Sequence, residues 1–71
     1  MSDFESIAKN RRLARADRNL ADDHDTAANL AVNPGKQTFH RRAAESCRAR
    51  ADAYERDADR EEAQYEQDAH R

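Results

Sequence analysis

The sequence has little of what builds a disulfide-stabilised domain, a membrane protein or a fold rich in loops. Its 71 residues include one cysteine, one proline, one glycine and no tryptophan. A single thiol excludes a disulfide within the chain, and no apolar run approaches the ~20 residues of a membrane-spanning helix. The acidic start "MSDFESIAKN" lacks the apolar centre of a signal peptide. We therefore expect a chain of the reducing cytoplasm with no membrane segment.

Proline and glycine are absent outside positions 34 and 35, which favours two uninterrupted helices. Alanine, arginine, glutamate and leucine dominate both sides of this pair, and all four favour helix. Asn33 is disfavoured in a helix because the ring of Pro34 crowds it. A capping box between Ser2 and Glu5 is expected to begin the first helix. The sequence predicts an all-α protein, a single two-helix antiparallel hairpin with helices at about 3–31 and 36–69 and a bend at 32–35.

The segment "NPGK" raises the alternative of a phosphate-binding loop. Such a loop requires a preceding strand and the spacing GxxxxGK[ST]. Here no glycine lies upstream, and Gln37 follows Lys36. Two helices alone also do not enclose a concave site of ~300 Å³ or more. We interpret the segment as a bend and expect no catalytic residue, no cofactor and no enzyme activity.

The order of charges along the chain supports the hairpin. In each predicted helix a basic part is followed by an acidic part. When the chain folds back at residue 34, the basic part of one helix therefore lies beside the acidic part of the other. Residue i then lies opposite residue 68 minus i. This register places Arg11 near Asp57, and it places "DDHD" (22–25) among Arg41, Arg42 and Arg48. Each exposed pair contributes only ~0.2–1 kcal/mol, but the pattern as a whole fixes the register.

Two apolar rows run along the first helix. One contains the leucines (Leu13, Ala16, Leu20, Ala27 and Leu30), and the other lies roughly 120° around the helix (Ile7, Ala14, Ala21 and Ala28). The second helix has a single stripe (Ala44, Cys47, Ala51, Tyr54, Ala58 and Tyr65). One row of the first helix packs on this stripe, and the other requires a further neighbour unless its alanines are only surface helix formers. Because a chain of this size seldom stabilises itself alone, we expect a homodimeric coiled-coil-like four-helix bundle, with core residues Ile7, Leu13, Leu20, Leu30, Cys47 and Tyr54.

Two groups of residues suggest chemistry and also have simpler explanations. Cys47 lies near Arg48 and Arg50, which would stabilise a thiolate, but it also belongs to the apolar stripe, so we expect a buried structural cysteine. His24 and His40 approach each other in the predicted register. Metal sites usually show clustered ligands such as HxxxH or CxxC, and the sequence contains neither, so we expect no metal site.

Exposed aromatic and arginine side chains are the expected contacts for a protein partner, because these types dominate binding energy at interfaces. The candidates are Phe4, Arg11, Arg15, Phe39 and Tyr65. For Phe39 we favour a position packed against Leu30 and Val32 over the bend, with an exposed contact as the alternative. The arginines also suggest a nucleic-acid-associated accessory protein, although a net charge of -2 disfavours nucleic acid.

The segment "NLAVNPGKQTFHRRAAESCRARADAYERDA" resembles small accessory proteins of temperate phages. In length and helical build, the chain is similar to phage quorum-sensing anti-activators. This resemblance implies a helical-hairpin dimer in the host cytoplasm that binds and inhibits a host protein, such as a LuxR-type transcription activator. It covers the overall pattern of the chain and assigns no functional residue.

Overall fold

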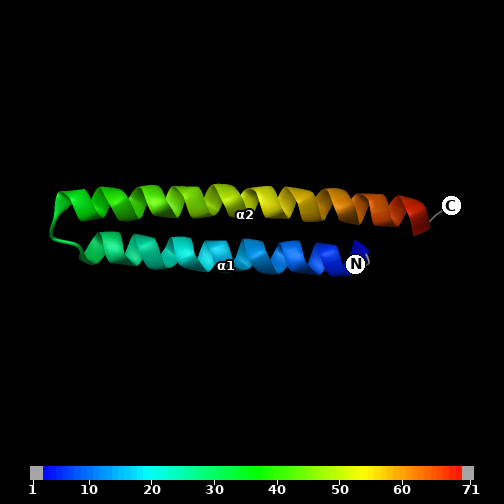
Figure 1. Ribbon diagram of the computed structural model, residues 1–71, viewed down its shortest axis with the longest axis horizontal. Coiled ribbons are helices and arrows are strands. Elements are labelled where there is room, and N and C mark those ends of the chain that lie inside the picture. Colours follow the sequence, from blue (N-terminus) through cyan, green and yellow to red (C-terminus); the bar gives the residue numbers. More distant parts are fainter. Residues whose placement is uncertain (1–2, 70–71) are drawn as a thin grey trace.

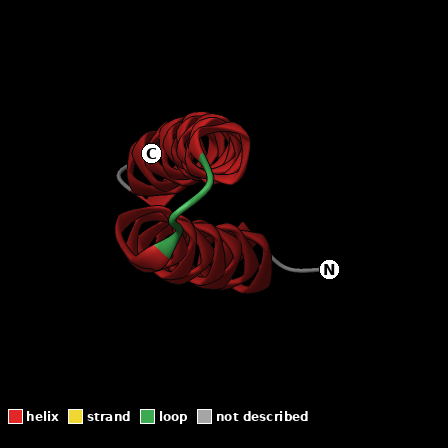
Figure 2. Cartoon of the chain, turned by 90° about the vertical axis from the view of Figure 1, so that its left-hand side faces the viewer, coloured by secondary structure: helices red, strands yellow, loops and turns green. Residues whose placement is uncertain are grey.

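A computed structural model describes residues 3–69, and these residues form two long helices joined by a short connection. Helix α1 covers Asp3–Leu30 and helix α2 covers Pro34–Ala69. They run antiparallel and side by side as an elongated hairpin, and α2 extends beyond the N-terminal end of α1 (Figure 1). The view along the long axis shows a single layer of two helices (Figure 2). The predicted all-α hairpin is confirmed. Ser2 lies outside the described residues, so the expected capping box stays a prediction.

The connection is built as the N-terminal cap of α2. The side-chain Oδ1 of Asn33 accepts hydrogen bonds from the amides of Gly35 (2.7 Å) and Lys36 (3.3 Å). Pro34 occupies the first helical position, where a missing N–H costs nothing. Helix α2 therefore begins two residues earlier than expected, and the bend is shorter. The sequence interpretation treated Pro34 as part of the bend, whereas an Asn-Pro pair also marks a helix start.

Substituting Asn33 with alanine is expected to destabilise the hairpin by about 1 kcal/mol, because the first amides of α2 lose their acceptor. Urea denaturation followed by circular dichroism measures this change. Asn29→Ala, at an exposed position of α1, is the control and should leave the free energy of unfolding nearly unchanged. Equal effects of the two substitutions would show that the cap contributes nothing.

The two helices pack through small side chains. On α1 the buried positions are Ile7, Ala14, Ala21 and Ala28, and on α2 they are Ala44, Cys47, Ala51 and Ala58. Ala21 packs with Ala44 and Cys47 at the centre of the interface. No fully buried side chain is large among the described residues. Alanine at the contact lets two helix backbones approach closely, since interaxial distance depends on the side chains between them.

The leucine row of α1 does not belong to this interface. Leu20 is 43% exposed and Leu30 is 78% exposed, whereas Leu13 and Tyr54 are half-buried. Leu20 and Leu30 are therefore not core residues of the single chain, and their place in the core of a dimer stays a prediction. The row of alanines packs on α2 instead, and the leucines are left on a flank of α1. Neither described helix is long and apolar enough to cross a membrane.

Candidate protein-binding surface

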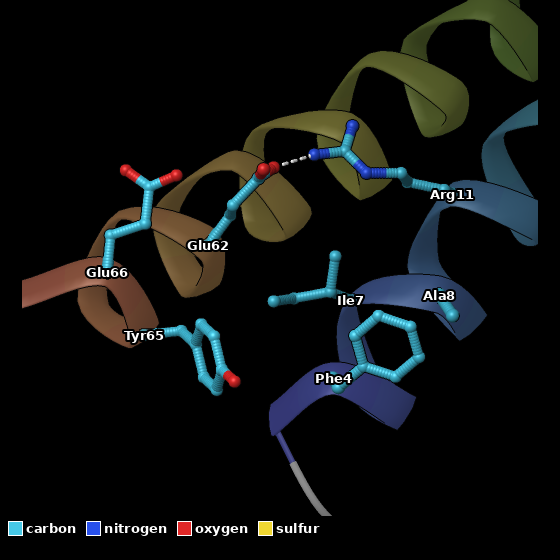
Figure 3. A pocket seen from close by; sticks show the side chains of 7 residues that line it. All are labelled: Phe4, Ile7, Ala8, Arg11, Glu62, Tyr65 and Glu66. Atoms are coloured by element: carbon cyan, nitrogen blue, oxygen red, sulfur yellow. Dashed lines mark hydrogen bonds and ion pairs between the residues drawn. The ribbon is translucent and has the colours of Figure 1, made fainter. Parts of the chain in front are cut away.

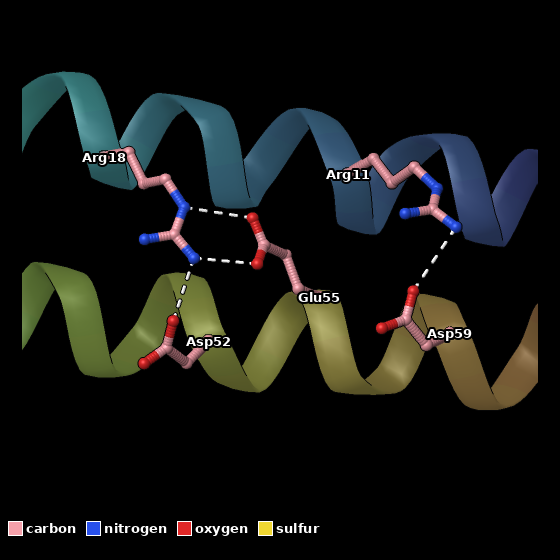
Figure 4. A network of polar contacts seen from close by, with 5 residues as sticks. All are labelled: Arg11, Arg18, Asp52, Glu55 and Asp59. Atoms are coloured by element: carbon pink, nitrogen blue, oxygen red, sulfur yellow. Dashed lines mark hydrogen bonds and ion pairs between the residues drawn. The ribbon is translucent and has the colours of Figure 1, made fainter.

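One flank of the hairpin carries a row of ion pairs between the helices. At its centre Arg18 donates to both carboxylate oxygens of Glu55, through Nε (3.0 Å) and Nη2 (2.7 Å), and also donates to Asp52 (2.8 Å) (Figure 4). Toward the open end of the hairpin, Arg11 contacts Asp59 and Glu62. All of these side chains are partly exposed, so the row fixes the register more than it stabilises the fold.

The same pattern continues toward the bend. Arg48 donates to Asp22 (3.2 Å) and to Asp25 (2.5 Å), and on the other flank Arg50 contacts Asp17 (3.1 Å). The "DDHD" segment thus meets Arg48 as expected. Two details of the predicted register are corrected by these contacts: Arg41 and Arg42 take no part in ion pairs with the described residues, and Arg11 meets Asp59 and Glu62 instead of Asp57. Long side chains on a flank reach along the opposite helix. They therefore contact residues a few positions away from the residue that the predicted register places directly opposite.

The ion pairs shift the titration of their members. The hydrogen bonds from Arg18 lower the pKa of Glu55, and the bonds to Glu55 raise the pKa of Arg18. A carboxyl whose pKa is lower in the folded chain stabilises the fold above its unfolded pKa, ~4.3 for glutamate. That contribution is lost as the pH falls through the lower folded value.

The free energy of unfolding is therefore expected to decrease as the pH falls from about 5 to about 3. In Glu55→Gln, which cannot ionise, part of this decrease should be missing. Urea denaturation at several pH values measures it, with Glu45→Gln as the matched control, because Glu45 is exposed and has no ion pair among residues 3–69. Identical pH profiles for wild type and Glu55→Gln would contradict the assigned contact.

At the open end of the hairpin, the ion-paired flank gives way to an apolar groove of about 450 Å³ (Figure 3). Its lining residues come from both helices: Phe4, Ile7, Ala8, Arg11, Glu62, Tyr65 and Glu66. The aromatic rings of Phe4 and Tyr65 lie on opposite sides of Ile7 and are 69% and 49% exposed. Arg11 contacts Glu62 at one end of this open-end groove, whereas Glu66 has no ion pair with any described residue.

The structure brings three of the five expected partner contacts together. Phe4, Arg11 and Tyr65 line the open-end groove. Arg15 lies farther along the same flank, in a shallow hollow with Arg11 and Arg18. Phe39 lies near the bend, at the opposite end of a molecule 58 Å long. The sequence does not single out Ala8, Glu62 and Glu66 as lining residues, although the predicted register places residue 4 opposite residue 64.

At the bend end, Phe39 packs on two histidines. Its ring centroid lies 6.4 Å from that of His24 and 5.2 Å from that of His40, in edge-on arrangements. The expected packing against Leu30 and Val32 is wrong, since these two side chains are 78% and 96% exposed and Phe39 itself is 63% exposed. The alternative of Phe39 as an exposed contact agrees better with its surroundings.

The two histidines meet as the predicted register implies. Their Nδ1 atoms are 2.9 Å apart, so one ring donates a hydrogen bond and the other accepts it. No group of three or more potential metal ligands occurs among residues 3–69. Cys47 is 3% exposed in the alanine interface, as expected, and the guanidinium of Arg50 lies 3.5 Å from its sulfur.

The arginines divide into paired and unpaired sets. Arg11, Arg18, Arg48 and Arg50 contact carboxylates of the opposite helix. Arg12, Arg15, Arg41, Arg42 and Arg56 are exposed and have no ion pair with the described residues. These unpaired arginines are scattered: two lie on α1, two lie near the start of α2, and Arg56 lies alone in the second half of α2. They do not form the continuous basic stripe that follows a phosphate backbone.

No match to this chain is found among protein-family models, curated proteins or solved structures.

Proposed function

We propose that this protein is a protein-binding helical module that inhibits its partner by covering a functional surface. The observation that carries the proposal is the open-end groove, where Phe4 and Tyr65 expose their rings beside Ile7. Large apolar side chains are normally buried when a chain has a core to take them. Here the core is alanine, and the large side chains lie on the outside. Contiguous exposed apolar surface with a polar rim is typical of an interaction site.

The mechanism would be occlusion, without chemistry by the chain itself. The hairpin is a stiff rod held in register by its ion pairs, and it would present the groove in one fixed geometry. A preformed surface binds with less loss of conformational entropy than a flexible one. Together with the resemblance to phage anti-activators, this supports a host protein as the partner, for example a LuxR-type transcription activator in the host cytoplasm.

Affinity capture from a host lysate, with and without nuclease, tests the proposal. We expect the tagged chain to retain one host protein at stoichiometric level after nuclease treatment. The alternative of a nucleic-acid-associated accessory protein predicts capture that disappears with nuclease and weakens steeply with salt. The paired arginines and the net charge of -2 make that outcome the less favoured one.

The leucine row supports a homodimer as the second part of this proposal. Leu13, Leu20 and Leu30 extend along one side of α1, and two of them are exposed in the single chain. A second copy would cover them in a four-helix bundle and would give a small chain the core that its alanine interface lacks. The dimer surface and the open-end groove are separate parts of the molecule.

Replacing Leu20 with glutamate is expected to give a monomer at micromolar concentration, because the charge would be buried in the dimer interface. Sedimentation equilibrium measures the mass of wild type and variant. Asn19→Glu, at the neighbouring exposed position, is the control. A wild-type chain that is already monomeric, or a Leu20→Glu variant that stays dimeric, would exclude this face.

A further inference from the structure

We infer that the open-end groove takes a basic amphipathic helix of the partner, with one aromatic or branched aliphatic side chain as its anchor and a lysine or arginine beside it. This inference rests on the proposed function and specifies the chemistry of the partner. It is carried by three features of the groove: its apolar floor, the charge on its rim, and the absence of a strand edge along which an extended segment would bind.

The floor and walls determine the anchor. Ile7 is 9% exposed, with Ala8 beside it on α1, and the rings of Phe4 and Tyr65 border the space above. A groove of about 450 Å³ accepts a large apolar side chain, and burying such a side chain contributes about 1.5–3 kcal/mol. Aromatic walls favour an aromatic anchor further, because ring pairs add to the gain from burial alone.

The rim determines the charge beside the anchor. Arg11 already contacts two carboxylates, those of Asp59 and Glu62. Glu66 stands at the other end of the groove without an ion pair among the described residues, on the far side of Glu62 from Arg11 (Figure 3). The three charged lining residues thus leave one unmatched negative charge. A cationic side chain complements it, whereas an acidic one would be repelled.

The backbone determines the conformation of the bound segment. Both walls are helices, and the described residues include no strand edge. At the open end, only the first amides of α1 and the last carbonyls of α2 lack a partner within their helix. An extended segment would therefore find no ladder of backbone groups and would leave most of its own polar groups unsatisfied on burial. A helix satisfies its own backbone and offers anchors at i, i+3, i+4 and i+7.

A displayed library of 16-residue peptides, built on an alanine-rich helical framework with randomised positions on one face, tests the inference with the full chain as bait. We expect enriched peptides to combine an aromatic or branched aliphatic residue with lysine or arginine three or four positions away. Glu66→Lys should weaken their binding about tenfold or more, because the rim charge is reversed. Glu45→Lys, exposed in the first half of α2, makes the same charge change away from the groove and should leave binding unaltered.

Other outcomes overturn the inference. Acid-rich peptides would place binding on the other side of Phe4, where Lys9 and Arg12 line a second hollow. Failure to enrich any peptide, or binding that is unaltered in Glu66→Lys, would remove the groove as a site for a basic helix. A groove that binds only a second copy of this chain would have the same consequence. The proposed function fails separately: it fails when no captured host protein remains after nuclease treatment, and it stands when capture persists in Glu66→Lys but is weakened in Phe4→Ser.

Discussion

Replacing Ala51 with leucine is expected to destabilise the protein strongly and to lower its thermal midpoint. Ala51 is 0% exposed and lies in the row where α2 meets α1. A leucine there must push the helices apart along their length, and overpacking of this kind costs about 1–3 kcal/mol or more. A single small core supplies only about 3–5 kcal/mol, so the loss is a large fraction of the total. Circular dichroism during thermal unfolding measures the effect.

Ala53→Leu is the matched control for this prediction. Position 53 is exposed, lies two residues farther along the same helix, and takes the same side chain. Leucine and alanine are both good helix formers, so any difference between the variants comes from packing. Ala53→Leu should keep the thermal midpoint close to that of wild type. Equal stability of Ala51→Leu and Ala53→Leu would show that the helices are not packed through the alanine row.

Replacing Phe4 and Tyr65 together with serine is expected to weaken partner binding by about 100-fold or more, while the hairpin stays folded. Each ring that fills a contact at an interface typically contributes about 2 kcal/mol, and each 1.4 kcal/mol is a factor of ten in affinity. Both rings are largely exposed in the free chain, so their removal costs little stability. Calorimetric titration with the captured partner gives the affinities.

Phe39→Ser is the control, because Phe39 is an aromatic side chain of similar exposure at the other end of the molecule. Its affinity for the partner should match that of wild type within about threefold. A partner that binds the Phe4/Tyr65 double variant normally but loses affinity for Phe39→Ser would move the binding surface to the bend.

Much of the fold follows from residue types alone. The absence of glycine and proline outside positions 34 and 35 leaves no position at which either helix would break. The order of charges along the chain then favours an antiparallel pair of helices. The hydrogen bonds from Arg18 to Glu55 and Asp52 are contacts of this kind. What the sequence did not decide is which row of α1 faces α2. Periodicity identifies a stripe but does not rank leucine against alanine, because close helix approach favours the smaller side chain at the contact.

The groove was predictable only in part. Phe4, Arg11 and Tyr65 stood out as exposed aromatic and basic residues, but nothing in their types separates them from Phe39 and Arg15. Their convergence depends on register, since residues 4 and 65 are neighbours only after the chain folds back. Glu66 belongs to an acidic run in which each carboxylate has a similar sequence context. Its unmatched charge becomes visible only when Arg11 is seen to contact Glu62 and Asp59.

The fold agrees with the proposal that this small chain acts by binding. Two helices expose most of their surface, and an alanine interface leaves the larger side chains outside. The result is a narrow rod with aromatic groups at both ends and ion pairs between them. Such a molecule has little interior in which to position catalytic groups. It has instead a long outer surface of fixed geometry, which suits the covering of another protein.

Photo-crosslinking in host cells is the most direct test of the central claim that the open-end groove is the partner-binding surface. A benzophenone side chain is introduced at Phe4, Tyr65 or Phe39 in turn, and the crosslinked proteins are identified by mass spectrometry. We expect positions 4 and 65 to crosslink to one and the same host protein and position 39 not to crosslink to it. Crosslinks from position 39 alone, or from none of the three positions, would contradict it.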